Sequence, residues 1–155
     1  MTWEFIFGRF LTLLLVCQLC LILWNLRVVI RPKSKLPKSY IKVSLLIPAR
    51  NEEGSVGACL RSLTNQDHDN IEIIVLDDHS TDRTRAIVES QGHNIKLVEG
   101  ESMPAGWTGK NWACHQLSLH ATGEVLFFID ADAILEPSAI TSVLHVMETE
   151  NVDMV

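Results

Sequence analysis

The stretch that decides the fold is "IEIIVLDDHSTDRTRAIVESQG", from Ile71 to Gly92. It begins with a continuous apolar run rich in β-branched residues, which is typical of a strand buried on both faces of a sheet. Polar residues follow, and a helix is then expected, with Ser80 or Thr81 as its N-cap and Gly92 as its stop. The stretch therefore predicts a strand followed by a helix that covers the sheet.

The same alternation extends in both directions along the chain. Further strands are expected at 41–49, 94–100 and 124–132, and "VDMV" at 152–155 looks like the opening of another. Further helices are expected within 52–66, at about 110–120 and from about 137. Strands alternating with helices predict an α/β fold with a mostly parallel, doubly wound, Rossmann-like sheet. Ligands bind such sheets at the carboxyl ends of the strands.

Charge is distributed unevenly between the two parts of the chain. Residues 1–40 carry six Lys or Arg against Glu4 alone, whereas residues 41–155 carry seven against eighteen acidic residues. Phosphate backbones are held by clustered Lys and Arg, so the acidic second part argues against nucleic acid as a partner. Its hydrophobic content is sufficient for one ordinary domain.

The N-terminal region is apolar, and Phe10 to Trp24 contains no charged residue. A run of about 20 such residues can cross a hydrocarbon core as a helix. A cleaved signal peptide is the alternative, but no small-x-small cleavage site follows the run. We expect a single anchor in the cell membrane at 1–30 and a basic juxtamembrane linker at 31–40. Because basic residues follow the span, the positive-inside rule places the domain on the cytoplasmic side.

Two carboxylates follow the strand expected at 124–132. Asp130 and Asp132 are spaced i, i+2, so on extended backbone both side chains point the same way. They repel each other unless a cation lies between them or one takes up a proton. Mg²⁺ or Mn²⁺ would resolve this repulsion, and such ions are commonly shared with substrate phosphates. For this pair alone, a solvated loop or helix cap is the alternative.

Two other polar clusters follow the first two strands. Asp77 and Asp78 end a buried strand, so one should point into the pocket and the other into the fold. A carboxylate at this place can accept the ring N–H of uracil or guanine, while Asp82 could instead serve the helix N-terminus. "PARNEE", at 48–53, brings Glu52 and backbone groups beside the same nucleoside. Three such clusters at three strand ends predict a nucleotide site.

The motifs "IPARNEE", "VLDDHSTDRT" and "ATGEVLFFIDADA", in this order, resemble the nucleotide-binding half of the family 2 glycosyltransferases of GT-A fold. The resemblance covers residues 41–155. The loop "MPAGWTGKNWAC", from Met103 to Cys114, is similar to membrane-anchored members that glycosylate polyisoprenoid-derived lipids, including hopanoid-associated and carotenoid-acid glycosyltransferases. The resemblance implies a nucleotide-sugar donor, with UDP favoured over GDP, and a lipid or isoprenoid acceptor.

The resemblance also implies a role for each matching position. The residues implied to bind the nucleotide-sugar are Pro48, Arg50, Glu52, Asp77, Asp78, Lys110 and Asp130. Among them, Asp78 is favoured for the base and Lys110 for the diphosphate. The implied metal ligands, for Mg²⁺ or Mn²⁺, are Asp130 and Asp132. Trp107 and Trp112 either line the donor or acceptor site or anchor the long loop onto the core.

The general base of the family lies beyond a further strand. This chain ends at Val155, inside the strand expected there, so we interpret 41–155 as the incomplete donor-binding part of a longer domain and assign no catalytic base. The predicted activity is metal-dependent, inverting glycosyl transfer. A non-catalytic, membrane-tethered module that binds nucleotide or a partner protein is the alternative. A nucleotidyltransferase would need a Gly-rich phosphate loop, and "PARNEEGSVG" is not one.

Overall fold

The computed structural model describes residues 3–28, 40–92 and 94–155. These residues form two compact units, an N-terminal helix and an α/β domain. The expected basic linker lies, except for Tyr40, outside the described residues, as do the first two and the last two residues of the expected anchor.

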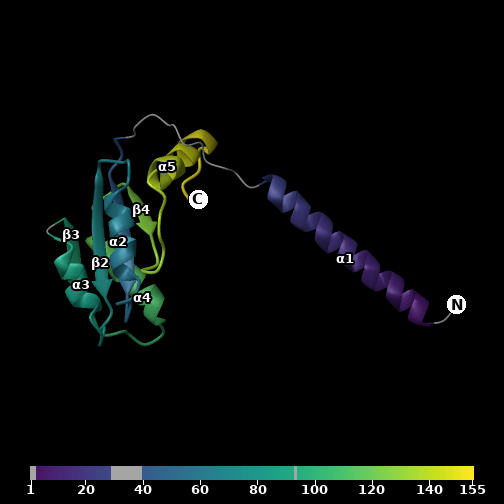
Figure 1. Ribbon diagram of the computed structural model, residues 1–155, viewed down its shortest axis with the longest axis horizontal. Helices are drawn as coiled ribbons and strands as arrows, with labels where there is room; N and C mark the ends of the chain where they lie inside the picture. The colour runs from purple at the N-terminus through teal and green to yellow at the C-terminus, as the bar shows by residue number, and fades with distance from the viewer. Residues whose placement is uncertain (1–2, 29–39, 93) are drawn as a thin grey trace. The chain divides into compact units, whose positions relative to one another are not determined.

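The N-terminal unit is a single helix, α1 (Trp3–Val28), drawn without a break in Figure 1. Its segment Phe5–Arg27 comprises 23 residues and is long and apolar enough to cross a membrane. At 1.5 Å per residue this segment spans about 35 Å, which matches the hydrocarbon thickness of a bilayer. A signal sequence satisfies the same criterion, so both interpretations of the N-terminus agree with this helix.

The described part of the α/β domain contains one parallel sheet. Its four strands are β1 (Val43–Ala49), β2 (Ile71–Asp77), β3 (Ile95–Glu99) and β4 (Val125–Phe128), in the order β3-β2-β1-β4. The chain moves outward from β1 through β2 to β3 and then crosses to the opposite side of β1. Figure 1 shows the two edge strands, β3 and β4, on opposite sides of β2. This reversal of strand order is the switch point of a doubly wound sheet, and it confirms the predicted fold class.

Helices cover both faces of the sheet. They are α2 (Val56–Thr64), α3 (Thr84–Ser90), α4 (Gly109–His120) and α5 (Ala139–Glu150). Leu45 and Ile47 of β1 belong to a buried cluster with residues of α2, α3 and α5. Leu46, between them, packs in a second cluster with Ala113 and Leu117 of α4. Because neighbouring strand residues face opposite sides, both faces require apolar residues, which explains the continuous apolar runs.

The strand before the two carboxylates is shorter than expected. β4 ends at Phe128 rather than at residue 132. The chain then turns, and the Ala133 N–H donates to the Asp130 carbonyl at 3.0 Å. Asp130 and Asp132 therefore lie on a turn, and the prediction of extended backbone between them is wrong. Leu126 and Phe128 are 40% and 48% exposed, whereas Val125 and Phe127 are partly buried, so β4 packs against the core on one face only.

Two other boundaries differ from the prediction. Helix α3 begins at Thr84, because residues 78–83 form a loop in which His79 has a φ of +55°. Residues 152–155 form no strand; the chain leaves α5 through Asn151, whose φ is +50°. The predicted stop at Gly92 is confirmed, since α3 ends at Ser90 and Gly92 has a φ of +98°.

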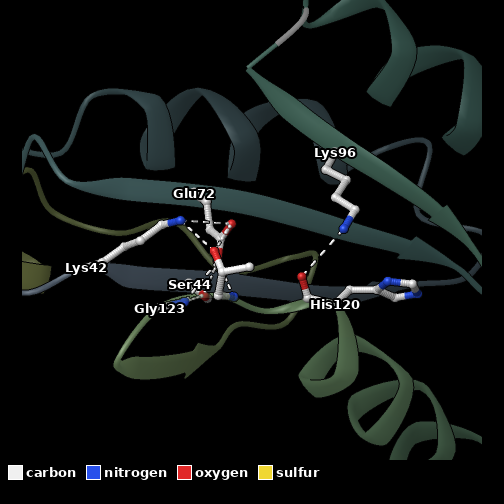
Figure 2. A network of polar contacts seen from close by, with 7 residues as sticks. Lys42, Ser44, Glu72, Lys96, His120 and Gly123 are labelled. Atoms are coloured by element: carbon white, nitrogen blue, oxygen red, sulfur yellow. Dashed lines mark hydrogen bonds and ion pairs between the residues drawn. The ribbon is translucent and has the colours of Figure 1, made fainter.

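A polar network joins the amino-terminal ends of the strands (Figure 2). The Glu72 carboxylate accepts hydrogen bonds from the Ser44 hydroxyl, the Thr122 N–H at 2.6 Å and the Gly123 N–H at 3.1 Å. Partial burial alone would raise the pKa of Glu72, but the hydrogen bonds from the Ser44 hydroxyl and from the N–H and hydroxyl of Thr122, with the charge of Lys42, lower it from 4.5 to about 2. The network fixes the connection between α4 and β4 against β1.

Candidate functional site

A cleft of about 400 Å³ lies at the carboxyl ends of β1, β2 and β4. The residues that line it are Pro48, Ala49, Arg50, Glu52, Asp78, Gly109, Lys110, Ala113, Asp130, Ala131 and Asp132. β4 pairs only with Val43–Leu46 of β1, whereas β1 continues to Ala49. The two strands therefore separate at this end of the sheet, which leaves space at the switch point where ligands of such folds bind.

Asp77 and Asp78 point in different directions, as the sequence predicts. Asp77, the last residue of β2, is buried, and its Oδ1 accepts the Ser80 N–H at 3.2 Å. Asp78 lines the cleft, with its Oδ2 3.4 Å from Arg50 Nη1. Of these two aspartates, Asp78 is therefore the one placed to contact a ligand in the cleft. A direct contact between Asp77 and the nucleotide stays a prediction.

The loops that follow β1 and β2 are held together by hydrogen bonds. Asn51, whose φ is +55°, donates its N–H to Ser80 Oγ at 3.0 Å and accepts the Thr81 N–H on its Oδ1 at 2.8 Å. The Glu52 N–H donates to Thr84 Oγ1 at 2.7 Å. The sequence motifs did not predict this role of Asn51. A usable signal was Asn51 itself, since Asn tolerates left-handed backbone and can bond to a neighbouring loop.

Asp82 completes this connection between the loops. Its Oδ2 accepts the Glu53 N–H at 3.1 Å, and its Oδ1 accepts the N–H of Thr84, the first residue of α3, at 2.9 Å. Desolvation opposes ionisation, but these hydrogen bonds and one from the Thr84 hydroxyl lower the pKa of Asp82. The expected role of Asp82 at the helix N-terminus is confirmed. Arg83 Nε lies 3.2 Å from Glu53 Oε2, so it also joins the two loops.

At the opposite end of the cleft, Lys110 contacts Asp130. Lys110 is the second residue of α4, and its Nζ lies 2.6 Å from Asp130 Oδ1. The hydrogen bond from this ammonium to Asp130 and the charges of Asp130 and Asp132 raise the pKa of Lys110. The structure therefore brings together two residues, 20 positions apart in the sequence, that the family resemblance implies for binding the nucleotide-sugar.

The turn after β4 presents both carboxylates of the Asp130/Asp132 pair to the cleft. Ala131, between them, is buried, so the middle residue faces the core and its two neighbours face the ligand space. Cys59 of α2 lies beneath the turn, with its Sγ 3.7 Å from the Asp130 carbonyl oxygen. Burial, together with the charge of Asp132, raises the pKa of Cys59 to about 11, so the thiol stays neutral.

The cleft carries more acidic than basic groups. Glu52, Asp78, Asp130 and Asp132 supply four carboxylates, and Arg50 and Lys110 supply two cations, so the formal charge is −2. Among the described residues, no group of three or more His, Cys, Asp or Glu is arranged to hold a metal ion. Two carboxylates suffice where phosphates and water supply the other ligands, as is usual for Mg²⁺. The donor set thus fits a metal shared with a nucleotide.

Trp107 and Trp112 do not line the cleft. The Trp112 indole N–H donates to the Glu101 carbonyl at 3.0 Å. The Trp107 ring packs edge-on against the Trp112 ring, with the two ring centroids 5.2 Å apart. The Trp107 ring also lies 5.0 Å from that of His115. The bond to Glu101 agrees with the alternative in which the tryptophans anchor the loop before α4, and a place for them in the acceptor site stays a prediction.

Comparison with known proteins identifies the family. Residues 44–155 match the family model of glycosyl transferase family 2. The chain belongs to glycosyl transferase family 2. This match covers the sheet, except for the first residue of β1, and every residue that lines the cleft. The predicted resemblance is confirmed.

Curated members of glycosyl transferase family 2 match the chain over part of their length. The 4,4'-diaponeurosporenoate glycosyltransferase of Staphylococcus haemolyticus is 38% identical over 93 residues, which are 60% of this chain and 24% of that protein. The enzyme of the same name from Staphylococcus aureus strain MRSA252 is 34% identical over 104 residues, 66% of this chain and 27% of that protein. The chain thus spans about a quarter of the length of these relatives.

Solved structures confirm the GT-A fold. Staphylococcus aureus TarS 1–349 superposes with a TM-score of 0.60 at 28% identity, over 72% of this chain and 33% of that one. Mycobacterium tuberculosis glucosyl-3-phosphoglycerate synthase, in complex with Mn²⁺, UDP and phosphoglyceric acid, superposes with a TM-score of 0.59 at 27% identity. The superposition covers 70% of this chain and 39% of that one. The mannosyltransferase PcManGT from Pyrobaculum calidifontis superposes with a TM-score of 0.64 at 24% identity, over 83% of this chain and 39% of that one. At this identity the likeness shows the fold alone.

Proposed function

We propose that the full-length protein is a membrane-anchored glycosyltransferase that transfers a sugar from a nucleotide-sugar to a lipid or polyisoprenoid-type acceptor. The observation that carries the proposal is the cleft at the switch point of the sheet. It combines Asp78, Lys110 and the Asp130/Asp132 pair from three separate segments of the chain. Membership of glycosyl transferase family 2 supports the reaction class.

The donor occupies this cleft with its base near Asp78 and its diphosphate near Lys110. Asp78 accepts the ring N–H of the base, and Pro48, Arg50, Glu52 and Asp77 form or support the nucleoside side of the site. UDP is the favoured nucleotide. Relatives of 27% and 29% identity support this choice, since they were solved with UDP and with UDP-GlcNAc respectively.

A divalent metal, Mg²⁺ or Mn²⁺, is held by Asp130 and Asp132. A cleft of formal charge −2 repels a nucleoside diphosphate, so a further cation is needed for the two to bind together. When bound there, the metal stabilises the charge that forms on the leaving diphosphate. Lys110 adds a second cation at the same end of the cleft. The relative solved with both Mn²⁺ and UDP supports this assignment.

The acceptor and the location are part of the same proposal. The curated relatives are named for 4,4'-diaponeurosporenoate, which supports a polyisoprenoid-type acceptor. Helix α1 holds the enzyme in the cell membrane, where such an acceptor dissolves, and the basic residues that follow it favour the cytoplasmic side for the domain. The transfer is inverting, as the family resemblance implies, and we assign no catalytic base.

The Asp132→Asn substitution in the full-length protein tests the metal site. We expect Mn²⁺-dependent UDP binding, measured by calorimetry, to weaken at least about tenfold, because even outer-shell changes at metal sites cost this much. Asp153→Asn, which removes the same charge outside the cleft, should bind like the wild type. UDP affinity that is unchanged after Mn²⁺ is chelated would contradict the metal assignment.

Turnover decides between an enzyme and the alternative of a non-catalytic module. We expect the full-length protein, in detergent with a polyisoprenoid acid or alcohol, to release UDP from a UDP-sugar. Binding of UDP without release of UDP from any UDP-sugar would favour the non-catalytic module.

A further inference from the structure

The contact between Lys110 and Asp130 has a consequence for how the cleft takes up its ligands. The Lys110 ammonium lies 2.6 Å from Asp130 Oδ1, and the two side chains are 64% and 58% exposed. Exposed ion pairs of this kind contribute little to stability, so solutes can exchange with either partner. Lys110 is therefore a counter-ion that can be displaced.

The oxygen that Lys110 contacts belongs to a proposed metal ligand. Carboxylate oxygens bind Mg²⁺ at about 2.0–2.1 Å. An ammonium group and a divalent ion that shared Asp130 would lie within a few ångströms of each other, and their like charges would repel strongly. Either Lys110 moves away or the metal binds less tightly.

A bound nucleotide removes this conflict. Its diphosphate supplies oxygens that accept hydrogen bonds from an ammonium group as a carboxylate does. Lys110 is at the N-terminal end of α4, on a side chain long enough to change partners without movement of the helix. Metal that binds alone therefore breaks the ion pair between Lys110 and Asp130. When metal binds together with a diphosphate, an ion pair between Lys110 and the diphosphate replaces it.

We propose that Lys110 is the resident counter-ion of Asp130, that it transfers to the diphosphate when the donor binds, and that it thereby makes the cleft select metal together with nucleotide over metal alone. This inference rests on the proposed function and adds a specificity-determining role for Lys110. The arrangement keeps the Asp130/Asp132 pair partly neutralised between catalytic cycles.

The test measures Mn²⁺ affinity of the full-length protein in detergent, from the electron paramagnetic resonance signal of free Mn²⁺, without UDP and with saturating UDP. Without UDP, Lys110→Gln should bind Mn²⁺ about two- to fivefold more tightly than the wild type, since it removes an exposed ion pair. With UDP this advantage should disappear or reverse, so UDP should strengthen Mn²⁺ binding less in the variant than in the wild type.

Two other variants serve as controls. Lys96→Gln removes the same charge from β3, outside the cleft, and should leave both Mn²⁺ affinities unchanged. Lys110→Arg keeps a cation and should retain most of the strengthening by UDP. Circular dichroism confirms that each variant is folded.

Equal Mn²⁺ affinity of the wild type and Lys110→Gln without UDP, including no detectable binding by either, would overturn the role of Lys110. That result leaves the proposed function intact provided that UDP binding to the wild type requires Mn²⁺. Wild-type protein that binds UDP equally well with and without Mn²⁺ would instead overturn the metal dependence, and with it the inference.

Discussion

Glu72 shows how a single carboxylate can determine the position of a distant segment. It lies at the amino-terminal end of β2 and accepts hydrogen bonds from Thr122 and Gly123, about 50 residues further along the chain. Its pKa is lowered from 4.5 to about 2, so ionised Glu72 stabilises the folded state. This contribution is fully present above about pH 4.5 and is lost as the pH falls towards 2.

We expect Glu72→Gln to lower the free energy of unfolding at pH 7 by about 1–2 kcal/mol, because charge-assisted hydrogen bonds are replaced by neutral ones. The difference from the wild type should narrow between pH 4.5 and pH 2, where the wild-type carboxylate becomes protonated. Chemical denaturation at several pH values, followed by fluorescence, measures this. A difference that is constant across this range would show that ionisation of Glu72 contributes nothing.

Glu148→Gln is the matched control for this experiment. Glu148 is exposed on α5 and takes part in none of the ion pairs found among the described residues. Its substitution should leave the free energy of unfolding within about 0.5 kcal/mol of the wild type.

At the level of single residues, the candidate site was partly accessible from the sequence. Strand alternation and two adjacent aspartates were sufficient to predict that one carboxylate enters the cleft and one enters the fold, as Asp78 and Asp77 do. The role of Asn51 was not accessible, because its partners Ser80 and Thr81 come from another loop. Sequence periodicity reports which face a residue takes, but not which distant group it meets.

Among the elements, the connection between α4 and β4 is constrained most closely. A Cβ atom on Gly123 would lie 2.6 Å from the Ser44 nitrogen and 2.7 Å from its hydroxyl oxygen. The connection thus approaches the backbone of β1 more closely than any side chain permits, and the Gly123 N–H bonds to Ser44 Oγ at 2.8 Å. This close approach explains the glycine in the "ATGE" segment that precedes β4.

Gly123→Ala should therefore destabilise the domain by about 1–3 kcal/mol, the usual cost of overpacking a tight contact. Thermal unfolding of the full-length protein in detergent measures the loss. Gly54→Ala is the control, since a Cβ at Gly54 meets no atom within 4 Å. Equal melting temperatures for the two variants would contradict the close approach.

The elements themselves were predicted well where the local pattern is strong. β1, β2 and β3 begin within two residues of the expected positions, because their apolar runs are bounded by polar residues. β4 and α3 were misjudged for a physical reason. The end of β4 is set by its pairing with only Val43–Leu46 of β1, and the start of α3 by hydrogen bonds to the loop after β1. Both depend on tertiary contacts.

For the whole molecule, the main division is between a basic, apolar N-terminal region and an acidic domain. Residues 1–40 carry a formal charge of +5 and residues 41–155 a charge of −11. The anionic cytoplasmic leaflet attracts basic segments beside a membrane span and repels acidic ones. This asymmetry supports the proposed orientation, with the basic segment at the membrane surface.

A retained anchor and a cleaved signal sequence make different predictions for the mature protein. We expect intact residues 1–30 in the membrane fraction after alkaline carbonate washing, detected by mass spectrometry. Replacing both Val16 and Leu19 in α1 with Arg should release the protein, since each charge at a helix centre costs about 2.5–3.5 kcal/mol. Val16→Leu with Leu19→Val should stay bound. A mature protein that lacks residues 1–30 would favour the signal sequence.

The sequence by itself determined the order of the strands and helices, the burial of both faces of β1 and β2, the apolar N-terminal segment and the three polar clusters at strand ends. These features follow from local periodicity and composition. Only the tertiary structure decided that Lys110 contacts Asp130, that Asn51 joins two loops and that the cleft opens where β4 leaves β1. The reason is that such contacts depend on how α4 and the loops pack against the sheet, and no local propensity encodes the distance between groups so far apart in the chain.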